Sequence, residues 1–145
     1  MQFRWVSLLP GNVSVIKNLA NKSVLLVDDN ARMLRELEKV LGGEGCKVTC
    51  ASLLADAIDI LLQKKTLMDL VITDLWRPTV TSLAGLHAIH NLFPDVPVIV
   101  LSTFGSSEVK AACLRLRVPF LEKPLETWQL LSAVEGVFAS QKAAP

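Results

Sequence analysis

The sequence predicts an α/β fold in which five helices cover a five-stranded, doubly wound parallel sheet. Short apolar runs rich in branched residues recur five times, and segments with helical spacing of apolar residues lie between and after them. Parallel strands need long crossover connections, which are usually helices. Two of the runs, "VITDLW" and "VIVLS", are nearly unbroken apolar stretches, as expected of central strands covered on both faces.

The five expected strands lie in "SVLLVDD", "CKVTCA", "DLVITDL", "VPVIVLS" and "VPFLEKP". The first expected helix carries an apolar stripe from Met33 to Leu41, and we expect Gly42-Gly43 to end it. A second stripe runs from Leu54 to Leu62. Three shorter or less regular helices are expected over residues 83–92, 106–116 and 126–138.

The composition indicates one globular domain and excludes several classes of protein. The chain has 145 residues, of which 51% are hydrophobic and 20% charged, which argues against disorder. Its net charge of only +1 gives no sign of a nucleic-acid or basic membrane surface. No apolar run approaches the roughly 20 residues that span a bilayer. The odd count of three cysteines predicts reduced thiols and a cytoplasmic setting.

Polar side chains follow four of the five expected strands. The first strand ends at Asp28-Asp29, the third at Asp74, the fourth at Ser102 and the fifth at Lys123. In doubly wound sheets the carboxyl ends of the strands share one edge, where ligands bind. Three clustered carboxylates raise one another's proton affinity unless a cation neutralises them, and Mg²⁺ is a hard ion that suits few carboxylate ligands. The sequence therefore predicts a magnesium site at this edge.

Each of these residues also has an ordinary explanation when it is taken alone. Asp28, Asp29 or Asn30 could cap a helix that starts near Ala31. Asp74 could be an exposed loop residue, the hydroxyl at the fourth strand could belong to a turn, and the lysine could be solvated. Their joint occurrence at strand ends of one sheet favours a shared site.

Four motifs in order, "LLVDDN", "DLVITDLWRP", "VIVLST" and "FLEKP", resemble the receiver domain of bacterial two-component response regulators. The resemblance covers about residues 22–139, which leaves 1–21 as an N-terminal extension or linker and 140–145 as a C-terminal tail. It implies a flavodoxin-like, receiver-type fold. It also implies a phosphoprotein of a two-component system or phosphorelay, which catalyses only its own phosphorylation and dephosphorylation.

The resemblance also implies a role for each site residue. Asp74 would accept a phosphoryl group from a phosphohistidine on a sensor histidine kinase or a phosphotransfer protein. Mg²⁺ would be held by Asp28, Asp29, Asp74 and the backbone carbonyl of Trp76. Ser102 and Lys123 would hold the phosphoryl oxygens, Ser102 and Phe120 would form the switch, and the Lys123–Pro124 peptide would be cis.

Three features depart from the family pattern. The segment between Asp74 and Gly85 is about three residues longer than usual, so we expect the third helix to begin irregularly. Thr103 stands where the family usually has alanine or glycine, and its bulk would slow both phosphoryl attack and hydrolysis. "LRLRVPF" lacks the small Gly-Ala pair that normally leads into the fifth strand, so we expect the shape of the output surface to differ from the family's usual one.

The leading hypothesis is a phosphorylation-controlled signalling switch. Its output surface would span residues 106–138, and it would bind an unidentified output protein or a second copy of the chain, with no direct contact to nucleic acid or membrane. The alternative is a receiver-like interaction module that does not depend on phosphorylation. A hydrolase of small phosphorylated substrates would need a substrate cap or a second general acid/base, and we identify no segment of the sequence that supplies either. The exposed contacts of the output surface are expected at Lys110, Arg115, Arg117 and Trp128.

Overall fold

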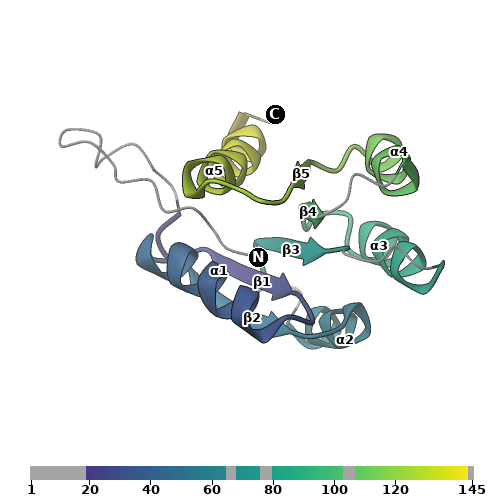
Figure 1. Ribbon diagram of the computed structural model, residues 1–145, viewed down its shortest axis with the longest axis horizontal. Coiled ribbons are helices and arrows are strands. Elements are labelled where there is room, and N and C mark those ends of the chain that lie inside the picture. Colours follow the sequence, from purple (N-terminus) through teal and green to yellow (C-terminus); the bar gives the residue numbers. More distant parts are fainter. Residues whose placement is uncertain (1–18, 65–67, 76–79, 103–106, 144–145) are drawn as a thin grey trace.

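The computed structural model describes residues 19–64, 68–75, 80–102 and 107–143 and confirms the doubly wound parallel sheet (Figure 1). Its strands follow the order β2-β1-β3-β4-β5 and all are parallel. The strand order reverses once, because β2 is added on one side of β1 and β3 to β5 on the other, which places the topological switch point between β1 and β3. The strands are β1 (Ser23–Val27), β2 (Lys47–Ala51), β3 (Leu70–Asp74), β4 (Val98–Ser102) and β5 (Phe120–Glu122). The helices are α1 (Ala31–Gly43), α2 (Leu54–Lys64), α3 (Val80–Leu92), α4 (Ser107–Leu116) and α5 (Thr127–Ala143). None of the described helices is long and apolar enough to cross a membrane.

Alternating side chains of the strands build one apolar core on each face of the sheet. Val24, Leu26 and Ile72 point to the side covered by α1 and α5, and we call this the α1/α5 core. Leu25, Val71 and Val100 point to the side covered by α2, α3 and α4, which we call the α2/α3/α4 core. Figure 1 shows the two groups of helices on opposite sides of the sheet. Burial on both faces explains why the central strands are nearly continuous apolar runs.

The parallel register brings the carboxyl ends of the strands to one edge. Asp74 of β3 lies opposite Leu101 of β4, and Val27 of β1 lies opposite Thr73. Backbone hydrogen bonds continue past the strand ends, from Leu75 N–H to Leu101 O at 2.9 Å and from Lys123 N–H to Ser102 O at 2.8 Å. Because these bonds extend the ladder, the residues that follow each strand keep a defined place at this edge.

Helix α1 ends at Gly43, as the sequence predicts, and a left-handed turn follows it. Gly42 and Gly43 are the last two residues of α1, and the glycine with positive φ is Gly45, at +90°. Gly45 N–H donates to Gly42 O and Cys46 N–H donates to Leu41 O, which is the hydrogen-bond pattern of a Schellman motif. The expectation that Gly42-Gly43 ends the helix is therefore confirmed, and the left-handed turn comes two residues after Gly43.

The turn before β1 packs against this helix end. Leu19 is 1% exposed and lies in the α1/α5 core, and its carbonyl accepts a hydrogen bond from the Cys46 thiol. Asn21 N–H donates to Gly45 O at 2.8 Å. The ammonium of Lys22 lies 5.1 Å from the ring centre of Phe138 on α5, within the range of a cation–π contact. Residues 19–21, which we expected in the N-terminal extension, thus contact the body of the domain.

Candidate functional site

The acidic pair after β1 is arranged so that neither carboxylate caps helix α1. Asn30 is the N-cap residue, because its side-chain oxygen accepts the Met33 N–H at 3.1 Å. Asp28 is buried, at 3% exposed, and one of its oxygens accepts the Asn30 N–H at 2.9 Å. Asp29 is exposed to solvent. With the cap supplied by Asn30, both carboxylates remain available to the edge of the sheet.

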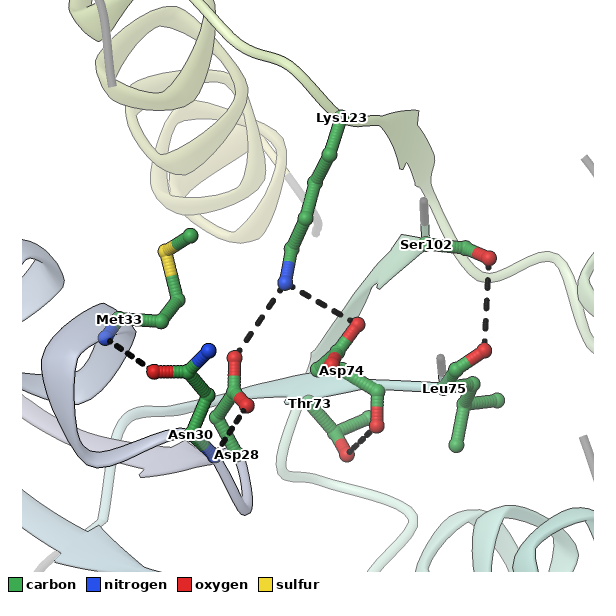
Figure 2. A network of polar contacts seen from close by, with 8 residues as sticks. All are labelled: Asp28, Asn30, Met33, Thr73, Asp74, Leu75, Ser102 and Lys123. Carbon is green, nitrogen blue, oxygen red and sulfur yellow. Dashed lines mark hydrogen bonds and ion pairs between the residues drawn. The ribbon is translucent and has the colours of Figure 1, made fainter. Parts of the chain in front are cut away.

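Lys123 joins β1 to β3 through its ammonium group (Figure 2). Its Nζ lies 3.3 Å from Asp28 Oδ2 and 3.2 Å from Asp74 Oδ1, and the side chain is 3% exposed. The peptide between Lys123 and Pro124 is cis, as the family resemblance implied. A buried ammonium between two carboxylates neutralises part of their charge, which reduces the cost of burying them together.

The electrostatic environment of Asp74 favours a bound cation. Burial raises the pKa of its carboxyl to about 6, the ammonium of Lys123 opposes that shift, and the charges of Asp28 and Asp29 add to it. Asp74 Oδ1 is buried, and its contact with Lys123 has the distance of an ion pair without hydrogen-bond geometry, so no described residue donates a hydrogen bond to it. A cation beside this oxygen would lower the pKa of Asp74 and would compensate for the missing hydrogen bond to Oδ1.

The described carboxylates have the geometry of a small metal site. One oxygen each from Asp28, Asp29 and Asp74 lies within 4.8 Å of the other two. The set consists of hard oxygen donors, and exposed Asp29 leaves room for water ligands, which matches the preference of Mg²⁺. The expected fourth ligand, the carbonyl of Trp76, lies outside the described residues, as does Thr103.

Ser102 occupies the end of β4 as expected, but its hydroxyl does not point at Asp74. It is fully buried and donates to the carbonyl of Leu75 at 3.4 Å, and Figure 2 shows it turned away from the Asp74 carboxylate. The reason is the pleat of the strand. Leu101 projects into the α1/α5 core, so the next side chain, Ser102, projects to the opposite face.

Phe120 lies on the same face as Ser102. It is partly buried and packs against the α2/α3/α4 core, which includes Val109 and Cys113 of α4. The residues expected as exposed output contacts, Lys110, Arg115, Arg117 and Trp128, are all exposed. Phe120 therefore lies between the site edge and the surface formed by α4, β5 and α5.

Sequence reasoning missed one polar residue at the site. Thr73 is fully buried beside Asp74, and its hydroxyl lies 3.4 Å from the carbonyl oxygen of that residue. Within "LVITD" it looks like an ordinary β-branched strand residue. Only its place directly before a strand-end aspartate distinguishes it.

Comparison with known proteins agrees with this geometry. The family model of the response regulator receiver domain matches residues 24–135. The chain is 32% identical over 123 residues to the transcriptional regulatory protein GlrR of Escherichia coli, covering 84% of this chain and 27% of that protein. It is 34% identical over 116 residues to the two-component response regulator ORR26 of rice, covering 79% of this chain and 20% of that protein. The chain thus spans about a quarter or less of the length of these relatives.

Solved structures share the fold at lower sequence identity. A response regulator receiver domain protein from Clostridium thermocellum superposes with a TM-score of 0.76 at 24% identity, covering 84% of this chain and 98% of that one. A CheY-like receiver domain protein from Methanospirillum hungatei superposes with a TM-score of 0.77 at 22% identity, covering 86% and 98%. The matched residues include β1 from Val24 onward, the other four strands and the acidic edge described above, and the chain belongs to the response regulator receiver domain family.

Proposed function

We propose that this domain is a phosphorylation-controlled switch in which Asp74 accepts a phosphoryl group from a phosphohistidine. The donor would be a sensor histidine kinase or a phosphotransfer protein, and the reaction would require Mg²⁺. The observation that carries the proposal is the arrangement at Asp74. Lys123 Nζ lies 3.2 Å from Asp74 Oδ1, and one carboxylate oxygen each from Asp28, Asp29 and Asp74 lies within 4.8 Å of the other two.

This arrangement suits nucleophilic attack on phosphorus. One oxygen of ionised Asp74 forms a bond to phosphorus while the bond between phosphorus and the donor's imidazole nitrogen breaks. The electron pair of that bond stays on the nitrogen, which takes a proton from solvent. Phosphoryl transfer depends mainly on positioning and on neutralising oxygen charge. The rigid strand end supplies the positioning, and Lys123 supplies one positive charge.

The other polar residues divide the remaining work. Bound Mg²⁺ supplies further positive charge to the phosphoryl oxygens and favours the ionised carboxylate. Asp28 and Asp29 would hold that ion, and Asn30 fixes Asp28 through its backbone N–H. Ser102 acts after transfer: its hydroxyl would leave the carbonyl of Leu75, a bond of 3.4 Å at the long end of hydrogen-bond lengths, for a phosphoryl oxygen. Phe120 would then repack, which changes the surface offered to an output partner.

The proposal is tested by intact-mass measurement after incubation with Mg²⁺ and acetyl phosphate. The wild-type protein should gain one phosphate, and Asp74→Asn should gain none. Asp59→Asn, which removes an exposed carboxylate on α2, is the matched control and should be phosphorylated like wild type. Equal yield in wild type and Asp74→Asn, or no adduct in wild type with or without Mg²⁺, would overturn the assignment and favour an interaction module that does not depend on phosphorylation.

A further inference from the structure

The end of β5 carries two charged residues that are adjacent in sequence and point to opposite faces of the sheet. Lys123 points into the acidic site, where its ammonium contacts Asp28 and Asp74. Glu122 points to the other face, where its carboxylate lies 2.9 Å from the ammonium of Lys110 on α4. The same pleat places Leu121 against the α1/α5 core and Phe120 against the α2/α3/α4 core. One peptide unit therefore connects the acidic site to helix α4.

Helix α4 has few other attachments to the sheet among the described residues. Its buried side chains are Val109, Ala112 and Cys113, and partly buried Leu116 also packs against the α2/α3/α4 core. Leu114 is 80% exposed, and Lys110 and Arg115 are also exposed. Few buried apolar groups must separate when such a helix opens, so its opening responds to small changes in the remaining contacts, of which the ion pair is one.

The ion pair itself is open to solvent, since the side chains of Lys110 and Glu122 are 48% and 53% exposed. An ordinary surface pair of this kind contributes little to the stability of a whole domain. The same small free energy shifts the local opening equilibrium of α4 by up to severalfold, and amide hydrogen exchange in the helix reports that shift. The relevant property of this pair is its position between Lys123 of the acidic site and helix α4.

We propose that Lys110 and Glu122 form a clasp that holds α4 closed on β5 and is released when Lys123 moves. The release step rests on the proposed function: a phosphoryl group on Asp74 draws the Lys123 ammonium away from its present place between two carboxylates. The end of β5 follows, and Glu122 turns out of contact with Lys110. Helix α4 then opens more often, and the surface that it shares with β5 and α5 changes.

The first experiment concerns the free protein and does not depend on phosphorylation. Amide hydrogen exchange over residues 107–116 should be about two- to fivefold faster in Glu122→Gln and in Lys110→Gln than in wild type. The charge reversal Lys110→Glu with Glu122→Lys should restore slow exchange. Arg115→Gln removes the same charge from the same helix without breaking the pair, and it should leave the exchange near wild type. Unchanged exchange in both single variants would overturn the clasp.

Salt provides a second test in the same state. Raising the salt concentration from 0.1 M to 1 M shortens the screening length from about 10 Å to about 3 Å. Exchange in α4 should therefore become faster in wild type and stay nearly constant in Glu122→Gln. Equal salt dependence in the two proteins would show that the pair does not hold the helix.

The release step is tested with beryllofluoride and Mg²⁺ as the phosphoryl analogue. Wild-type α4 should then exchange as fast as α4 of free Glu122→Gln, and the analogue should add little to the exchange of that variant. An equal fold-change in both proteins would remove the pair from the path between the site and the helix. If the analogue changes exchange nowhere in wild type, including at residues 26–30 and 72–75, the proposed function fails while the clasp of the free protein stands or falls on the first experiment.

Discussion

Two helices of this domain, α1 and α4, end in the same hydrogen-bond pattern but place different residues in the left-handed position. In α1 the residue is Gly45, with φ of +90°, and in α4 it is Arg117, with φ of +57°. At α4, Val118 N–H donates to Cys113 O at 2.9 Å and Arg117 N–H donates to Leu114 O at 3.3 Å, which repeats the Schellman pattern of α1. A residue with a Cβ is disfavoured in this conformation by about 1 kcal/mol relative to glycine.

The comparison separates a relaxed end of the molecule from a strained one. The α1–β2 turn is held by glycine, by the buried side chain of Leu19 and by the bond from Asn21 to Gly45. The α4–β5 turn carries an exposed arginine in a conformation that favours glycine, beside a helix with a narrow buried stripe. The strained end lies next to the surface through which we propose that the switch acts. Low local stability there fits a segment that must move.

The largest effect is expected from adding a side chain at the relaxed end. A Cβ at position 45 would lie 3.2 Å from Ala20 Cα and would also carry the positive φ. Gly45→Ala should therefore lower the free energy of unfolding by about 2–3 kcal/mol, measured by urea denaturation. Gly43→Ala is the matched control, because a Cβ there meets nothing within 4 Å and φ is not positive. It should raise stability by about 0.5–1 kcal/mol. Equal effects at the two positions would show that the turn is not held as described.

The second-largest effect on stability is expected from the charge of Asp74 at the acidic edge of the sheet, not from backbone strain in a turn. The folded-state pKa of Asp74 is raised to about 6, so between pH 4 and 6 the folded protein binds more protons than the unfolded chain. Without Mg²⁺, the free energy of unfolding that Asp74 contributes should be greatest at low pH and should fall as pH rises from about 4 to about 6.

Asp74→Asn removes this pH dependence. Without Mg²⁺ at pH 7.5, the variant should be about 1–2 kcal/mol more stable than wild type, because the folded protein no longer has to ionise a carboxyl whose pKa is raised. Part of this gain is lost because Lys123 loses an ion-pair partner. The difference between the two proteins should shrink below pH 5 and when Mg²⁺ is added to wild type. Urea denaturation at several pH values measures it. A constant difference from pH 4 to pH 8 would contradict the raised pKa.

Relieving the strained end should have a smaller effect of the opposite sign to Gly45→Ala. Arg117→Gly should raise the free energy of unfolding by about 0.5–1 kcal/mol and slow the amide exchange of α4. Arg115→Gly, inside the same helix, should instead lower stability by about 1 kcal/mol. If both substitutions destabilise the protein equally, Arg117 is not strained and the contrast between the two turns is lost.

These differences also mark what the sequence could predict. The convergence of Asp28, Asp74 and Lys123 follows from strand order and parallel pairing, which the apolar runs and their spacing indicate. The end of α1 at Gly43 follows from "GGEG", but the glycine that takes the left-handed position does not follow from local propensity, because contacts with Ala20 and Asn21 select the third. The direction of the Ser102 hydroxyl depends on where the carbonyl of Leu75 lies, which is a tertiary property.

The finest comparison of the two turns uses cysteines that the chain already carries. Cys46 forms the last hydrogen bond of the α1 turn, and Cys113 accepts the matching bond in the α4 turn. Both thiols are buried, and burial raises the pKa of each, so a thiol reagent reaches either one only when its turn opens. A strain of about 1 kcal/mol at the α4 turn corresponds to about fivefold more frequent opening. In a Cys50→Ser background, which removes the partly exposed third thiol, Cys113 should therefore be labelled about fivefold faster than Cys46, after each rate is divided by its rate in urea. Arg117→Gly should bring the two rates together by slowing Cys113 alone, whereas equal rates before that substitution would show that the arginine turn is as closed as the glycine turn.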